Sequence, residues 1–202
     1  MPRAEHRAER QNLIARSAAE IIADEGIEGA TFRAIAQRSG LSKGVVEHYF
    51  SGKQDIIRKT QEWINEQALS REQRATRRKR GLAAARARML SLMPVNRELI
   101  SEWKIRIHYW SSAIASRDEQ LGMSLRITGA RERFSGDLQQ AVADGEIPAG
   151  TNIQAATNVL LHLLAGVSCN QLADPTYYTR KYQVTLIDDC LNRLQSGRGL
   201  PL

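Results

Sequence analysis

Residues 30–50 read ATFRAIAQRSGLSKGVVEHYF, and this stretch decides how the chain folds. It predicts two short helices joined by a tight turn at Gly40-Leu41-Ser42. Thr31 and Ser42 stand before the two helices, and their hydroxyl groups are of the kind that caps helix N-termini. A longer helix over about 6–25, with apolar residues three and four apart, precedes the pair. The first fifty residues therefore fit a three-helix unit.

Helical periodicity continues along the rest of the chain. Apolar side chains recur every three or four residues in almost every segment, and none alternates as a strand does, so the sequence predicts an all-α protein. The predicted helices span about 6–25, 31–39, 43–49, 53–80, 82–92, 97–116, 118–144, 152–171 and 176–194. We expect capping boxes at Ser51/Gln54 and Thr151/Gln154, and Asp174 as the cap of the last helix.

The composition is that of an ordinary globular protein. Of 202 residues, 42% are hydrophobic and 25% charged. The longest strongly apolar stretch, 159–167, falls far short of the roughly 20 residues that a membrane span needs. The N-terminus is charged and lacks the apolar region of a secretory signal, so a cytoplasmic protein with no membrane partner is expected. Cys169 and Cys190 lack metal or redox spacing and are expected to be core or reduced thiols.

The net charge of +7 is concentrated in residues 71–88. Glu72 is the one acid in this segment. Its basic side chains are Arg71, Arg74, Arg77, Arg78, Lys79, Arg80, Arg86 and Arg88. A solvated helix face is the interpretation that we favour for such a charge run, and a phosphate-binding stripe is the alternative.

The two short helices have the form of a helix-turn-helix, which places its second helix in the major groove of DNA. Helical geometry predicts that this helix turns Val46 and Phe50 inward. Its outward residues, available to read bases, are Lys43, Gly44, Val45, Glu47 and His48. Residues suited to bind phosphate are Thr31, Ser42, Tyr49 and Lys53. A simple helical hairpin is the alternative.

This part of the sequence resembles the DNA-binding signature of the tetracycline-repressor (TetR) family of bacterial transcriptional regulators. The resemblance covers about residues 10–57 and rests on the run from Ala30 to Gly44, followed by His48-Tyr49-Phe50 and Lys53. Arg33, within that run, joins the expected DNA-binding residues.

One residue departs from the family pattern. Glu47 stands where the family commonly has a tyrosine, and an acid there would either accept a hydrogen bond from cytosine N4 or repel phosphate. The run over 44–50 is closer to the choline-responsive, BetI-like branch of the family, which also lacks that tyrosine.

The resemblance implies two domains with different functions. Residues 1–52 would form the DNA-binding domain, and residues 53–202 the helical ligand-binding and dimerisation domain. Family members are homodimers, and the last two helices would form the interface, which their surplus apolar surface fits. A small molecule bound in the C-terminal domain would then release a palindromic operator, as in a repressor, with 54–80 as the connecting lever.

The sensory half contains one dense aromatic cluster. Trp103, Tyr109 and Trp110 lie on the helix over 97–116, with Arg106 between them. Trp103, Ile107, Trp110 and Ile114 share a face at helical spacing. Core packing is the interpretation that we favour, and a pocket wall is the alternative. An aromatic cage would suit a quaternary ammonium ligand such as choline, although Arg106 would repel it. An anionic or amphipathic ligand is the other possibility.

Two polar residues in the apolar run near the C-terminus are further candidates. His162 is either a satisfied core histidine or a ligand contact, and Asn158 would share its face of the helix. His108 and His162 lack the spacing of a metal site, so no metal and no cofactor is expected.

Other functional classes find little support in the sequence. It contains no Gly-rich phosphate loop, no GxSxG and no HExxH, so an enzyme is not expected. A helical adaptor or ligand-binding protein that has lost DNA binding is the alternative, and Glu47 gives it slight support.

Overall fold

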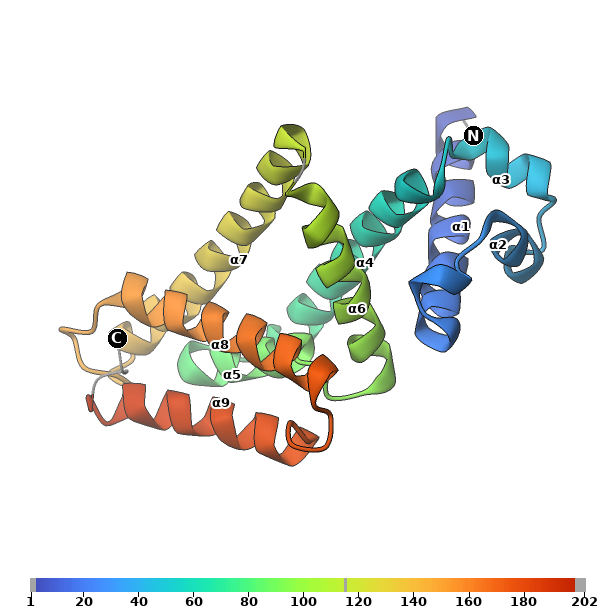
Figure 1. The fold of residues 1–202 in the computed structure, drawn as a ribbon. Helices are drawn as coiled ribbons and strands as arrows, with labels where there is room; N and C mark the ends of the chain where they lie inside the picture. Colours follow the sequence, from blue (N-terminus) through green and yellow to red (C-terminus); the bar gives the residue numbers. More distant parts are fainter. Residues whose placement is uncertain (1–2, 115, 199–202) are drawn as a thin grey trace. The chain divides into compact units, whose positions relative to one another are not determined.

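The structure, a computed structural model, describes residues 3–114 and 116–198. Within these ranges the chain has nine α-helices, one short 3₁₀ turn (η1, Ile27–Gly29) and no strand (Figure 1), which confirms the all-α prediction. The helices are α1 (Arg3–Glu25), α2 (Phe32–Ser39), α3 (Lys43–Tyr49), α4 (Lys53–Thr76), α5 (Gly81–Leu92), α6 (Arg97–Ala113), α7 (Arg117–Ala143), α8 (Ile153–Ala173) and α9 (Arg180–Gln195).

The long helix α4 ends earlier than predicted, at Thr76 instead of near Arg80. Gly81, expected to break the helix, is the first residue of α5 and has a φ of 55°. The Glu146 carboxylate caps α5 by accepting a hydrogen bond from the Leu82 N–H at 2.6 Å. A Cβ at position 81 would lie 2.2 Å from the Glu146 Oε2 atom. The backbone conformation therefore favours glycine here, and a side chain would also displace the Glu146 carboxylate.

Two capping predictions are wrong by one residue. At the start of α4, Asp55 and not Gln54 accepts the hydrogen bond from the Ser51 N–H, at 3.3 Å. At the start of α8, Asn152 accepts from the Ala155 N–H at 3.0 Å. The Thr151 hydroxyl instead donates to the Pro148 carbonyl at 2.7 Å, so the cap of α8 falls to the next residue.

The last helix begins later than predicted. The Asp174 carboxylate accepts hydrogen bonds from the Thr176 hydroxyl at 2.7 Å and from the Tyr177 N–H at 3.1 Å, which makes a local turn. The cap of α9 is instead Thr179, whose Oγ1 accepts from the Tyr182 N–H at 3.3 Å.

The chain forms two compact units, and each is described by itself. The first contains the residues up to Gln67 and Ile100–Ser112, and the second contains Ala68–Leu99 and the residues from Ala113 on. The predicted boundary at residue 52 separates a DNA-binding domain from a ligand-binding domain by function. The two compact units are defined by their internal contacts, so the functional boundary stays a prediction.

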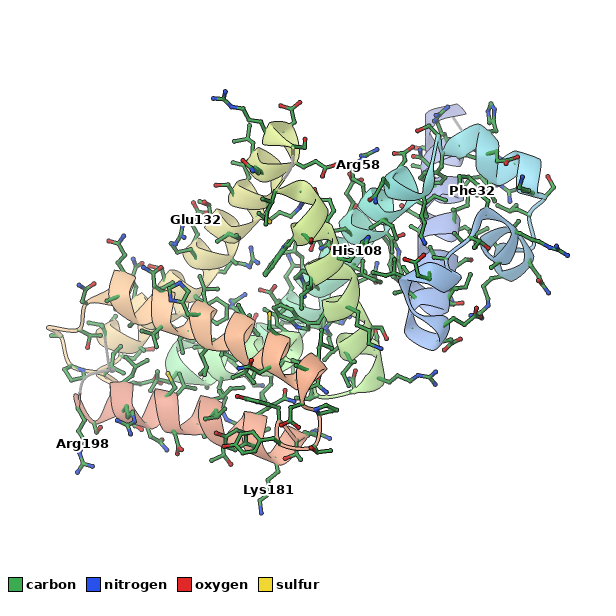
Figure 2. All side chains as sticks on the ribbon, viewed as in Figure 1. Phe32, Arg58, His108, Glu132, Lys181 and Arg198 are labelled. Atoms are coloured by element: carbon green, nitrogen blue, oxygen red, sulfur yellow. The ribbon has the colours of Figure 1, made fainter. Side chains whose placement is uncertain are left out.

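The first unit has one continuous apolar core, to which α1, α2, α3, α4 and α6 contribute. Its members are Ile14, Ala18, Ile21, Ile22, Ala30, Ile35, Ala36, Val46, Phe50, Ile56, Ile57, Ile64 and Ile105. Phe32 packs against this core from α2 and is half-buried (Figure 2). The predicted three-helix unit is thus extended by the start of α4 and by α6.

In the second unit α5 packs on α7 and α9, and α8 packs on α7 and α9 (Figure 1). The largest fully buried side chains here are Met89, Met93, Phe134 and Leu138. Of the two free cysteines, Cys190 is buried and Cys169 is exposed, so a core thiol is found at one position only. No helix among the described residues is long and apolar enough to cross a bilayer.

A buried ionic network joins α4, α5 and α7 inside the second unit. The Glu72 carboxylate, on α4, is 2.9 Å from the guanidinium groups of Arg88 on α5 and Arg133 on α7. Arg88 also makes two hydrogen bonds to Asp137, at 2.7 and 3.2 Å. Burial opposes the charge of Arg88, but the hydrogen bonds and attraction of Asp137 and Glu72 outweigh it, so the pKa of Arg88 is raised.

The basic segment 71–88 is therefore only in part the solvated face that we favoured. Arg88 is buried, and the Arg86 guanidinium binds the Asp188 carboxylate at 2.6 and 3.0 Å. Spacing alone could not reveal this, because the acids that pair with these arginines lie far along the chain. The exposed remainder that could still act as a charged face is Arg74, Arg77, Arg78, Lys79 and Arg80.

We expect Glu72→Gln to lower the free energy of unfolding by about 3 kcal/mol, because it leaves Arg88 and Arg133 without a shared counter-charge in a buried site. Urea unfolding followed by circular dichroism measures this change. The matched control is Glu66→Gln, on the exposed part of α4, which should change stability by less than about 0.5 kcal/mol. Equal effects of the two substitutions would contradict the structural role of the network.

The Arg86–Asp188 pair predicts a small pH dependence of stability. The hydrogen bond and the attraction of Arg86 lower the pKa of Asp188 against a weaker effect of burial. The pair therefore stabilises the fold at pH above about 4, and this contribution is lost as the pH falls through the lowered pKa. Because the Asp188 side chain is 38% exposed, solvent screening keeps the effect below about 1 kcal/mol.

The free energy of unfolding is measured as the pH is lowered. In Asp188→Asn, the part of the decrease in stability that comes from protonation of Asp188 should be absent. It should also be absent in Arg86→Met, because this substitution removes the cause of the shifted Asp188 pKa. Different pH profiles for the two variants would show that the pair is not their common origin.

Candidate nucleic-acid interface

The turn between α2 and α3 is held by backbone geometry and two hydroxyl caps. Thr31 Oγ1 accepts from the Ala34 N–H, and Ser42 Oγ accepts from the Val45 N–H, both at 3.2 Å, as predicted. Gly40 ends α2 with a φ of 69°, a left-handed conformation that a side chain would strain. These contacts fix the path of the chain from α2 into α3.

The inner face of α3 fixes how the helix is rotated. Val46 is 0% exposed and Phe50 3% exposed, and both belong to the core of the first unit. A seven-residue helix would not be stable alone, so this packing holds it. The prediction that Val46 and Phe50 face inward is confirmed.

The predicted DNA-binding residues all belong to the first unit. The exposed ones are Thr31, Arg33, Ser42, Lys43, Gly44, Glu47 and His48. Val45, Tyr49 and Lys53 are half-buried. None of the ten is buried, and both their grouping into one surface and their contacts with DNA stay predictions.

Two of the predicted cations are already paired. The Lys43 ammonium is 2.8 Å from the carboxylate of Glu47, one turn further along α3. The Lys53 ammonium lies 2.9 Å from the carboxylate of Glu28, and its hydrogen bond and charge lower the pKa of Glu28. Because an ammonium has three donors, either lysine can keep its carboxylate and still offer a hydrogen bond to another acceptor.

One residue that the sequence did not indicate lies beside this surface. The guanidinium of Arg7, on α1, lies 5.7 Å from the centre of the Tyr49 ring, and Arg7 is exposed. We predicted no role in DNA binding for the first helix. Only the repeated basic residues near its start could have suggested one. Arg7 adds a positive charge next to a predicted phosphate contact.

Four of the six predicted ligand-binding residues lie on α6 in the first unit. Trp103 and Tyr109 are buried, and Arg106 and Trp110 are half-buried. The rings of Trp103 and Trp110 meet edge to face, with centres 6.0 Å apart. The Arg106 guanidinium lies 4.7 Å from the centre of the Trp103 ring. A cation of the protein itself thus already lies over the face of this ring.

The face predicted for α6 is wrong at its end, because Ile114 is 65% exposed while Ile105 and Ala113 are buried. The apolar spacing that selected Ile114 continued past Ala113, where the helix ends.

The other two predicted ligand residues lie on α8 in the second unit. Asn158 is half-buried and accepts a hydrogen bond from Arg131 Nε at 3.4 Å. His162 is exposed, so its interpretation as a core histidine is wrong. The convergence of all six residues on one pocket stays a prediction.

The second unit also contains an open groove of about 360 Å³ between α5 and α9, lined in part by Leu82, Arg86 and Asp188. None of the predicted ligand residues lines it. In the described part of the chain, no three His, Cys, Asp or Glu side chains gather as a metal site.

These features define a helix-turn-helix protein in which a larger helical unit accompanies the DNA-binding motif. Residues 14–60 match the family model described as "Bacterial regulatory proteins, tetR family". The DNA-binding domain over these residues is therefore of the tetR type.

Curated relatives support the assignment. The chain is similar to the HTH-type transcriptional regulator PksA of Bacillus subtilis, with 28% identity over 119 residues, which is 58% of each chain. It is similar to the HTH-type transcriptional regulator BetI of Cronobacter sakazakii, with 31% identity over 115 residues, 54% of this chain and 55% of the relative. The chain therefore spans less than two thirds of the length of these relatives.

Solved structures share the fold over almost the whole chain. A transcriptional regulator from Rhodococcus sp. Rha1 has a TM-score of 0.77 at 21% identity, covering 95% of this chain and 99% of that one. A putative transcriptional regulator from Saccharomonospora viridis, solved in complex with choline, has a TM-score of 0.79 at 16% identity, covering 91% and 96%. At these identities the similarity establishes the fold alone.

Proposed function

We propose that this protein is a TetR-family transcriptional repressor that binds palindromic operator DNA as a homodimer and is released by a small-molecule effector. The observation that carries the proposal is the exposed side of α3, held rigidly by buried Val46 and Phe50 within a TetR-type domain. The BetI relative and the choline-bound neighbour support a choline-like effector.

The hydroxyl groups around the motif suit phosphate binding. Thr31 and Ser42 use an oxygen lone pair to cap α2 and α3. Each hydroxyl keeps its O–H donor, because capping uses only an acceptor. Phosphate oxygens accept such bonds and fix the register of a protein on the duplex, while Lys43, Gly44 and His48 face the bases.

Dimerisation through α8 and α9 is supported by the character of the α8 surface. The 21-residue helix contains no Asp, Glu, Lys or Arg, yet several of its residues are exposed. The exposed ones are Gln154, His162, Gly166, Cys169, Asn170 and Ala173. Depletion of charge on an exposed face is typical of the centre of a protein interface. A symmetric pair would place two α3 helices on successive major grooves, about 34–36 Å apart.

Coupling between effector and operator would use α4, which runs unbroken from Lys53 to Thr76 and so joins the DNA-binding unit to the second unit. An effector would change operator affinity tenfold if it bound one arrangement of the two DNA-binding domains of the dimer more tightly by about 1.4 kcal/mol.

We expect Lys43→Ala and His48→Ala each to weaken operator binding by about tenfold or more, because each removes a base-edge contact. The operator is first selected from a pool of randomised duplexes with the wild-type protein, and affinity is then measured by fluorescence anisotropy. Binding should weaken with salt, with a slope of roughly 0.9 per phosphate contact.

The control for these variants is Lys104→Ala, which removes an exposed lysine from α6. Unchanged melting temperatures would show that all three proteins are folded. Wild-type affinity in both α3 variants would rule out α3 as the reading helix. If the wild-type protein selects no operator at all, the alternative, a helical adaptor without DNA binding, is favoured.

For the effector, we expect choline or betaine aldehyde to raise the melting temperature by several degrees at a concentration about 100-fold above the dissociation constant. Trp110→Ala should abolish the shift, because it removes a half-buried ring beside Trp103. Tyr177→Ala, which removes an exposed ring from the second unit, is the control. A shift with fatty or aromatic acids and none with quaternary ammonium compounds would exclude the choline-like effector.

A further inference from the structure

We propose that Lys43 and Glu47 act together as one base-reading pair that selects a G·C base pair at one position of each operator half-site. The inference rests on the proposed binding of α3 to DNA. It concerns Glu47 above all, which is the one acidic residue of α3.

The two side chains form one surface feature in the structure. They lie one turn apart on α3, with the Lys43 Nζ atom 2.8 Å from the Glu47 Oε1 atom. Both remain accessible, with 61% and 47% of their side chains exposed. The pair has no net charge, so it offers little attraction to an arbitrary phosphate, which Lys43 attracts and Glu47 repels.

Gly44 provides an independent indication that something approaches this face closely. It lies inside α3 and does not have a positive φ, so the backbone does not require glycine. A Cβ there would meet nothing within 4 Å, so the packing of the chain does not require it either. Because glycine weakens a helix relative to alanine, its presence next to Lys43 fits a site where the backbone lies against another molecule.

A G·C base pair supplies the matching chemistry. In the major groove, guanine presents two adjacent acceptors, O6 and N7, and cytosine presents the N4 donor beside them. An ammonium group only donates and a carboxylate only accepts, so Lys43 can donate to guanine O6 and N7 while Glu47 accepts from cytosine N4. Each group of the pair thus finds a matching partner on this base pair.

An A·T pair does not offer this match. Its adenine donor lies between two acceptors, adenine N7 and thymine O4, followed by the thymine methyl group. A carboxylate that reaches the donor then lies beside acceptors on both sides, and the ammonium finds no adjacent pair of acceptors. The Lys43–Glu47 pair should therefore reject A·T at the position it reads.

The test compares duplexes selected from a randomised pool by the wild-type protein, by Glu47→Gln and by Glu132→Gln. Glu132 is exposed on α7 (Figure 2), so its substitution makes the same charge change outside the DNA-binding motif. We expect the wild type and Glu132→Gln to select one motif with a fixed G·C pair in each half-site.

Glu47→Gln should lose the preference for G·C over A·T at that position by about tenfold, because an amide both donates and accepts and suits adenine. It should also bind random duplex more tightly, with a salt slope steeper by about 0.9, as Lys43 becomes available to phosphate.

Two outcomes would overturn the inference, and they can be told apart. If Glu47→Gln selects the wild-type motif and gains affinity equally for all duplexes, Glu47 only repels phosphate, and operator binding by α3 still stands. If the wild type selects no motif and Lys43→Ala leaves duplex binding unchanged, the proposed function fails together with the inference.

Discussion

The burial of Val46 and Phe50 is the constraint on which the DNA-binding surface depends. A helix as short as α3 gains too few internal hydrogen bonds to persist alone, so its formation and its rotation are both set by two side chains in the core of the first unit. Once these two residues are fixed, the helical period alone determines that Lys43, Gly44 and Glu47 point outward. The chemistry of the exposed face can vary without disturbing the fold, because none of its residues belongs to the core.

The second unit is organised by a different kind of interaction. Glu72 lies at the end of α4 that belongs to this unit, and it is held by arginines from α5 and α7. Such a network has strict geometry, since each buried charge needs its partners, whereas apolar contacts tolerate sliding. The end of α4 is thus fixed within the second unit by directional bonds.

Local signals in the sequence predicted the first unit well and the second less well. The caps Thr31 and Ser42, the turn at Gly40 and the limits of α3 depend on residues a few positions apart, so the pattern contains them. The roles of Arg88 and Glu146 depend on partners 49 and 64 residues away, and no periodicity encodes those contacts. The cation over Trp103 was missed for another reason: spacing places Arg106 near the ring, but not above it.

The contact between Gly81 and Glu146 ties the start of one helix to a loop far along the chain. The Glu146 carboxylate accepts the hydrogen bond from the Leu82 N–H that starts α5, and it lies where a Cβ at position 81 would be. A side chain at 81 would strain the backbone, which has a φ of 55°, and would also push the carboxylate aside. The two positions are thermodynamically coupled, so the effects of substitutions at 81 and at 146 on stability do not simply add.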